Sequence, residues 1–188
     1  MSGPSVAPAP PPAKAGDASA NPHRALRVVK AVVNVGVGES GEPLSKAEKV
    51  LQMVTGQKPV QTRAHSTNRD FGIRKGQAIG AKVTLRGTTA VTFLGRAFDA
   101  RDRQLDVDSI DRNGNFSFGV ADYTDFAGMK YDPAIGIHGM DVAVEVGRAG
   151  FRVRDRRNRS RPIPRHLRSS SEETREFLRQ KFGVTIVE

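Results

Sequence analysis

The sequence contains no cysteine and no tryptophan among its 188 residues, and only two tyrosines. Without cysteine the chain has no means of forming a disulfide framework or a thiolate metal site. No apolar run approaches the roughly 20 residues that a helix needs to cross a bilayer, and no basic amphipathic helix with an aromatic face is present. The first residues also lack the apolar segment of a secretory signal. These absences favour a cytoplasmic protein with no membrane partner.

Several common binding-site and active-site motifs are incomplete in this sequence. Asp111, Asn113 and Asn115 imitate the first ligands of a calcium-binding loop. However, Phe116 stands where such a loop needs glycine, and Asp122 stands where it needs glutamate. No G-x-S-x-G motif supplies a nucleophile, and the spacing of the four histidines does not suit a metal: His23, His65, His138 and His166. We therefore expect no metal, no cofactor and no catalysis.

The segment Gly36–Gly41 matches the G-x-G-x-x-G pattern of dinucleotide-binding proteins. In such proteins the next helix receives a pyrophosphate at its N-terminus, where Glu39 and Glu42 would here place negative charge. No acid lies between Glu48 and Asp70 to bind a ribose hydroxyl. A tight connection, or a close approach of the backbone to another group, is the favoured interpretation. A nucleotide-binding enzyme that uses this turn is the alternative.

Positive charge is what the chain has in excess. It contains 30 Lys and Arg against 20 Asp and Glu, a formal net charge of +10. Such an excess is typical of proteins that bind nucleic acid. A basic module that binds a protein or an anionic lipid surface is a further hypothesis.

The charge is concentrated in residues 151–168, where eight arginines accompany a single acid, Asp155. Arginine binds phosphate bidentately and is weakly hydrated, so a nucleic-acid backbone is its natural partner. A solvated, disordered charge run is the usual alternative, but this run lies between a strand-like and a helix-like segment. The arginines that we expect to bind RNA are Arg152, Arg154, Arg156, Arg157, Arg159 and Arg161.

Composition divides the chain into a tail and one domain. Residues 1–22 are rich in Ala and Pro and bury too little apolar surface to offset chain entropy, so we expect them to be disordered. Residues 23–188 are expected to form a single domain. Hydrophobic patterning within it predicts strands at Leu26–Val37, Lys58–His65, Ala78–Arg86, Phe116–Val120, Gly139–Val146 and Val184–Val187.

Three helices are predicted between these strands. The first spans Ser45–Thr55 with a capping box of Ser45 and Glu48, and the second runs from Thr88 to about Arg103. The third follows a second capping box, Ser170 with Glu173, and ends at Gly183. Mixed strands and helices with short spacings predict an α+β fold, in which an antiparallel sheet has helices packed on one face.

Two segments combine basic and other exposed side chains. Alternation along Ala78–Arg86 places Lys82, Thr84 and Arg86 on one face of a strand, a polar platform for an RNA backbone. The loop Arg63–Lys75 surrounds its single aromatic residue, Phe71, with basic side chains. Such a loop suits RNA. The alternative, that Phe71 packs into the core, is equally compatible with the composition.

Five stretches follow one another in an order that carries a resemblance: VVNVGVGES, VTGQKPVQTRA, FGIRKGQAIGAKVTLRG, GNFSFGV and YDPAIGIHGMDVAV. Together they closely resemble the universal large-subunit ribosomal protein of family five, over roughly Leu26 to Val146. The arginine run and the last helix look like the archaeal and eukaryotic branch. The Ala/Pro-rich tail is not part of the family pattern.

The resemblance implies an α+β protein that binds 5S rRNA and large-subunit rRNA in the central protuberance of the ribosome, beside another 5S-binding ribosomal protein. It implies that Asn34, Gln57 and Thr84 hydrogen-bond 5S rRNA, and that Lys58, Lys82 and Arg86 contact phosphates. It also implies that the loop over residues 63–77 reaches towards P-site tRNA. The candidate residues in that loop are Arg63, His65, Asn68, Arg69, Phe71, Arg74 and Lys75.

Overall fold

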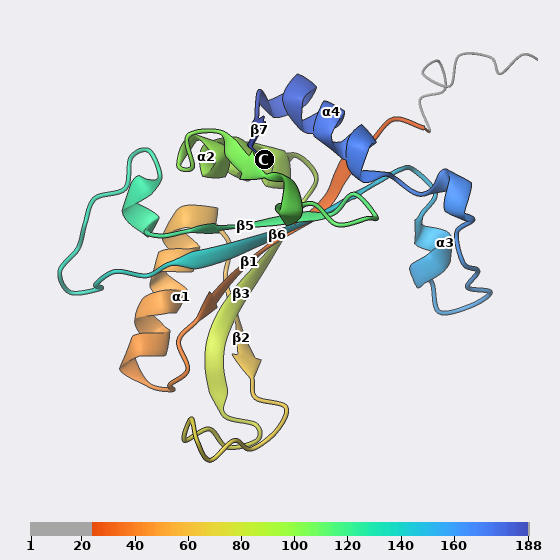
Figure 1. Cartoon of the computed structure of the whole chain (residues 1–188). Coiled ribbons are helices and arrows are strands. Elements are labelled where there is room, and N and C mark those ends of the chain that lie inside the picture. Colours follow the sequence, from red (N-terminus) through yellow and green to blue (C-terminus); the bar gives the residue numbers. More distant parts are fainter. Residues whose placement is uncertain (1–23, 188) are drawn as a thin grey trace, which may run out of the picture.

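The computed structural model describes residues 24–187, so the disorder expected for residues 1–22 lies outside the described residues. Within this range the protein has the expected α+β fold, with a five-stranded antiparallel sheet in the order β2-β3-β1-β6-β5 (Figure 1). Its strands are β1 (Arg27–Gly36), β2 (Val60–Arg63), β3 (Ala78–Arg86), β5 (Phe116–Val120) and β6 (Met140–Gly147).

Helices and a small second sheet complete the described part of the chain. The helices are α1 (Glu42–Thr55), α2 (Gly87–Asp99), α3 (Arg152–Asp155) and α4 (Ser171–Phe182). Short 3-10 turns span Val107–Ser109, Tyr123–Asp125 and Arg165–Leu167. β4 (Gln104–Asp106) pairs in parallel with β7 (Thr185–Val187). Among residues 24–187, no helix is both long enough and apolar enough to cross a membrane.

Side chains alternate between the two faces along each strand, and residues paired across neighbouring strands share a face. The main sheet therefore has one apolar face and one polar face. Val33 of β1 lies between Val83 of β3 and Val142 of β6, and all three are buried. The helices α1 and α2 pack on β1 and β3 over this apolar face. Each fully buried aliphatic or aromatic side chain contributes about 1.5–3 kcal/mol to this core.

Two helix boundaries differ from the sequence prediction. α1 begins at Glu42, three residues before the expected capping residue Ser45, because Pro43 fits the first turn of a helix. The Ser45 hydroxyl therefore donates to the Gly41 carbonyl from inside the helix. The predicted capping box at Ser45 was wrong. α2 ends at Asp99 because Asp102 and Arg103 adopt positive φ values of 53° and 55°.

The other predicted signals are confirmed. Ser170 and Glu173 form the capping box of α4, and Gly183 ends that helix with a φ of 64°. Gly56 ends α1 in the left-handed conformation. Strands β3 and β5 have the predicted bounds. β4 was missed because a three-residue strand with one buried side chain, Leu105, carries no readable period.

The N-terminus of α4 docks on the turn formed by Asn113 and Gly114. The Ser169 hydroxyl donates to the Asn113 carbonyl at 2.6 Å, and the Thr174 hydroxyl donates to the Gly114 carbonyl at 3.1 Å. At the other end of α4, Phe182 packs on Phe98 of α2 with ring centroids 5.3 Å apart. α4 is thus fixed at both ends, and with it the segment that leads into it.

Gly114 is required at this contact for two reasons, which makes its substitution informative. Its φ is 76°, and an added Cβ would collide with the Thr174 hydroxyl. We expect Gly114→Ala to reduce the free energy of unfolding by about 2–4 kcal/mol, because the cost of a left-handed backbone at alanine and the cost of overpacking against Thr174 add together. Urea titration would measure this. Gly128→Ala is the control, because Gly128 has a φ of 87° with open space around it, and strain alone costs about 1–2 kcal/mol. Equal losses would contradict the docking contact.

Candidate nucleic-acid interface

The polar face of the main sheet is the first part of a candidate RNA-binding surface. Lys82 of β3 lies opposite Asn34 of β1, and Arg86 lies opposite Lys30. Lys82, Thr84 and Arg86 are exposed, whereas Val83 and Leu85 between them are buried. The predicted division of β3 into a basic face and a core face is confirmed. This polar face of the sheet is hereafter called the open face.

Asn34 and Thr84 interrupt apolar strands, and the structure shows where their side chains lie. Asn34 is half-buried on the open face, between Lys82 and Asp141 of the neighbouring strands. Neither side chain hydrogen-bonds to another residue within 24–187, so no backbone turn satisfies them there. Gln57 and Lys58 are exposed in the connection from α1 to the edge strand β2. All six polar positions implied by the resemblance are therefore on the sheet or its rim.

The loop over residues 64–77 is an ordered extension of the β2–β3 hairpin. Backbone hydrogen bonds join Ala64 to Gln77, and Asn68 to Ile73 in both directions at 2.8 and 2.9 Å. The Asn68 side chain accepts from the Asp70 amide at 3.0 Å, which shapes the tip. Asn68 thus has an intramolecular role. In Figure 1 the hairpin projects at the bottom, away from α2 and α4.

Phe71 is at the tip of this hairpin with 74% of its surface exposed. The alternative that it packs into the core was wrong. Exposed basic side chains accompany it: Arg63, His65, Arg69, Arg74 and Lys75. An aromatic ring and cations on a projecting, internally hydrogen-bonded loop can stack on a base and neutralise phosphates together.

The arginine run forms an arm, residues 151–168, that leaves the end of β6 and contains the short helix α3. The Arg154 guanidinium binds the carboxylate of Glu145 on β6 at 2.9 Å and that of Asp155 at 2.9 Å. Glu145 also binds Lys30 of β1 at 2.9 Å. The arm is therefore attached by ion pairs to the open face. The sequence concealed this link, because the acid that holds Arg154 precedes it by nine residues, outside the arm.

These contacts change the acidity of the groups involved. Partial burial opposes ionisation of Glu145, but the hydrogen bonds from Lys30 and Arg154 outweigh it and lower the pKa of this carboxyl. The hydrogen bonds to Asp155 and Glu145 raise the pKa of Arg154. Both shifts favour the charged pair at neutral pH.

The remaining arm residues keep the arm's shape or point into solvent. The Arg156 guanidinium donates twice to the carbonyl of Arg159, at 3.0 and 2.8 Å, across a backbone that turns where Arg159 has a φ of 53°. Arg152, Arg157 and Arg161 are exposed, without a side-chain hydrogen bond in the described part of the chain. These three, with Arg159 and Arg165, are exposed arginines of the arm whose side chains make no hydrogen bond within residues 24–187.

The glycine-rich turn does not form a phosphate cradle. The amides of Val37 and Gly38 both donate to the carbonyl of Ile79, so they hold the turn against β3. Glu42 occupies the first turn of α1 and pairs with Lys46 at 2.9 Å, a hydrogen bond that lowers the pKa of Glu42. The negative charge that the sequence predicted at this helix terminus is in place. Among residues 24–187, no cluster of side chains suits a metal ion.

Comparison with known proteins assigns the chain. One family model, described as Ribosomal protein L5, matches residues 21–74, and a second, which describes the C-terminus of the same ribosomal family, matches residues 78–180. The chain belongs to the ribosomal protein L5 family. It is therefore a ribosomal protein and not an enzyme.

Relatives of this L5-family protein include three that are each named "Large ribosomal subunit protein uL5". The protein of Sulfurisphaera tokodaii is 53% identical over 89% of this chain and 96% of its own length. The protein of Picrophilus torridus is 51% identical over 89% and 96%, and that of Thermoplasma acidophilum is 49% identical over 89% and 99%. All three organisms are archaea, as the resemblance implied.

The two family segments interlock in the L5-family fold. Residues 21–74 supply β1 and the edge strand β2, while residues 78–180 supply β3, β5 and β6. β1 lies between β3 and β6, so the open face contains residues from both segments. The second segment also extends the match through the arm and most of α4, beyond the range in which the sequence motifs were recognised.

Acid should loosen the arm, because the folded-state pKa of Glu145 is lowered. Its ion pairs are fully present above the ordinary value of 4.5 and are lost as the pH falls through the lower folded-state value. We expect Glu145→Gln to remove about 1 kcal/mol of stability at pH 7, since the side chains of Lys30 and Arg154 are 39% and 49% exposed and solvent screens the pairs. We also expect it to flatten the fall in stability below pH 4.5. Chemical denaturation at a series of pH values would measure both effects.

Asp141→Asn provides the matched control. Asp141 is an exposed acid on the same face of β6, with no ion pair to another residue within 24–187. We expect it to leave both the stability at pH 7 and its acid dependence nearly unchanged. If the two variants behave alike, Glu145 does not anchor the arm.

Proposed function

We propose that this protein is a structural constituent of the large ribosomal subunit in the cytoplasm, where it binds 5S rRNA and large-subunit rRNA in the central protuberance. The observation that carries the proposal is the open face, a basic strand surface left uncovered within the described residues and joined by ion pairs to a cationic arm. Its relatives' shared name, "Large ribosomal subunit protein uL5", supports the assignment to the large subunit.

Two kinds of contact to RNA follow from the open face. Lys82 and Arg86, with Lys58 at the rim, offer charge to phosphates and fix the protein on the backbone. Asn34, Thr84 and Gln57 offer hydrogen bonds to sugars and unpaired bases. Since Asn34 and Thr84 have no other side-chain partner in the described range, an RNA hydroxyl or base edge would satisfy them.

The arm and the hairpin extend the surface in two directions. The exposed arginines of the arm suit large-subunit rRNA, whose phosphates they can bind bidentately. The hairpin tip, with Phe71 and its basic neighbours, reaches towards P-site tRNA in this proposal. A neighbouring 5S-binding ribosomal protein would complete the assembly. The nucleotide-binding alternative is disfavoured by the ion pair of Glu42 at the start of α1.

Neutralising the free arginines should weaken RNA binding in a salt-dependent way. Each phosphate contact contributes about 0.7–0.9 to the slope of log affinity against log salt concentration. We expect the double substitution of Arg157 and Arg161 by Gln to make this slope shallower by about 1.4–1.8. Filter binding to 5S rRNA and to large-subunit rRNA would measure it.

A second pair of substitutions controls for net charge. Lys49 of α1 and Arg179 of α4 are exposed on helices that pack away from the open face. Replacing both by Gln removes the same charge and should alter the slope much less. If the two double variants have the same slope, the arm arginines are solvated bystanders.

Removing the exposed ring of Phe71 should separate the role of the hairpin from that of the sheet. Phe71→Ala deletes a side chain outside the core, so folding and 5S rRNA affinity should be unchanged. Loss of a stacked base costs about 1–3 kcal/mol, so tRNA binding by ribosomes that carry the variant should weaken roughly 5- to 100-fold. A parallel fall in 5S rRNA affinity would contradict this division of roles.

A further inference from the structure

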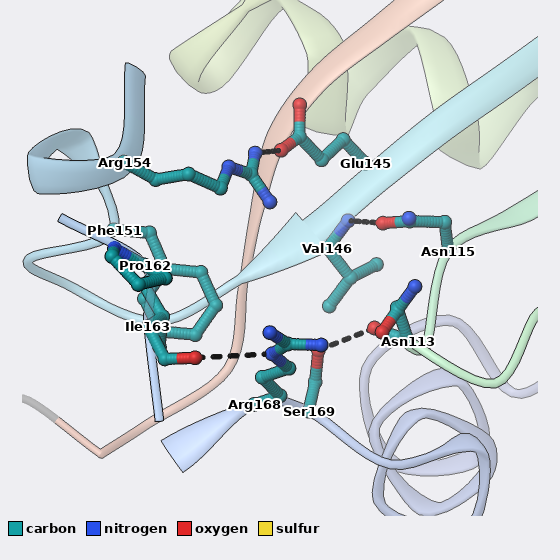
Figure 2. A pocket seen from close by; sticks show the side chains of 10 residues that line it. All are labelled: Asn113, Asn115, Glu145, Val146, Phe151, Arg154, Pro162, Ile163, Arg168 and Ser169. Carbon is teal, nitrogen blue, oxygen red and sulfur yellow. Dashed lines mark hydrogen bonds and ion pairs between the residues drawn. The ribbon is translucent and has the colours of Figure 1, made fainter. Parts of the chain in front are cut away.

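A cavity at the root of the arm lies beside the open face and has a volume of about 220 Å³. The arm forms one side of it, the end of β6 another, and the turn before β5 a third (Figure 2). Such a volume is smaller than the roughly 300–1,000 Å³ of pockets that enclose drug-sized ligands. It is therefore suited to a ligand smaller than a drug-sized molecule, such as a single base.

One wall of the cavity is apolar. Phe151, Pro162 and Ile163 of the arm lie side by side along it, as Figure 2 shows. The ring of Phe151 is fixed against the end of β6, because a Cβ on Gly147 would be only 3.3 Å from that ring. A flat ligand can pack on this wall, and the surrounding arginines make a polyanion the favoured source of the ligand.

The polar groups of the cavity are arranged as two opposite sets. Glu145 lies at one end, with one oxygen bound by Lys30 and the other by Arg154, and each oxygen retains a free lone pair. Arg168 lies at the other end, where its Nε donates to the carbonyl of Ile163 at 3.2 Å. Its two terminal nitrogens make no hydrogen bond to another residue in the described part of the chain.

Asn115 adds a donor between these ends. Its side-chain oxygen accepts from the amide of Val146 at 3.3 Å, which leaves its NH2 group free to donate. The cavity thus presents the two oxygens of Glu145 at one end, with Arg154 bound to one of them, and donors from Arg168 and Asn115 elsewhere. Guanine has the complementary edges: N1–H and the 2-amino group donate, while O6 and N7 accept and are a preferred target of arginine.

We propose that this cavity binds one unstacked guanine of ribosomal RNA, with Glu145 facing its N1–H and 2-amino group and Arg168 facing its O6 and N7. The proposal rests on the proposed RNA-binding function and adds to it a site that reads a base. Sequence-specific recognition of RNA commonly uses such extruded bases in single-stranded loops and bulges. The exposed arginines of the arm would hold the flanking phosphates.

Kethoxal probing tests the proposal, because this reagent modifies N1 and the 2-amino group of accessible guanines. The full-length protein would be bound to deproteinised 5S and large-subunit rRNA from Sulfurisphaera tokodaii. We expect one unpaired guanine to be protected by the wild-type protein. It should become reactive again with Arg168→Lys, which keeps the charge but loses the planar fork, and with Ile163→Trp, which fills the cavity.

Affinity measurements provide the matched comparison. Arg168→Lys should weaken binding roughly 5- to 100-fold without changing the salt slope, because one bidentate base contact is lost and no charge is removed. Arg165→Lys is the control, since Arg165 is an exposed arm residue outside the cavity lining. It should retain both the protection and the affinity.

The outcomes separate this site from the general function. If RNA binding depends steeply on salt but no guanine loses its protection in the Arg168 and Ile163 variants, the guanine site is overturned and the proposed function stands. Equal weakening by Arg165→Lys and Arg168→Lys would also overturn it. If the protein binds neither 5S rRNA nor large-subunit rRNA, both proposals are overturned.

Discussion

The alternation of side chains across the main sheet is the constraint on which the rest of the structure depends. Val33, Val83 and Val142 must all be buried together because they are paired across three strands, and their neighbours on each strand must then face the opposite way. A slip of β3 by one residue against β1 would expose the core side chains of β3 and bury Lys82 or Arg86, at a cost of several kcal/mol per charge. The hydrophobic effect therefore also sets the position of every polar group on the open face.

Charge pairing performs a second task, which is to place the arm. A run of arginines repels itself, and Asp155 alone compensates little of that charge. Glu145 joins the arm to the sheet by binding Arg154 and Lys30 at once, while Arg148 pairs with Glu173 at 2.6 Å and connects the end of β6 to α4. Glu145 and Glu173 offset the repulsion between neighbouring arginines and fix where the remaining arginines project. The net positive charge stays available for a polyanionic partner.

Local signals predicted the elements well and the connections between them poorly. The bounds of β3 and β5 and the capping box at Ser170 depend on residues close in sequence, so they were readable. The start of α1 was misjudged because Ser45 and Glu48 imitate a cap inside a helix that Pro43 starts earlier. The pairing of β4 with β7 joins segments about 80 residues apart, and a three-residue strand gives no pattern from which to infer it.

The sequence by itself determined the fold class, the basic character and the family, since composition, period and ordered motifs are properties of the chain alone. It also placed Lys82, Thr84 and Arg86 on one face, because a strand has a period of two. Tertiary structure decided that Phe71 is exposed, that Arg154 is held by Glu145, and that Asn115 and Arg168 meet around one cavity. These are contacts between segments distant in sequence, and only the packing of residues 24–187 as a whole fixes which side chains they bring together.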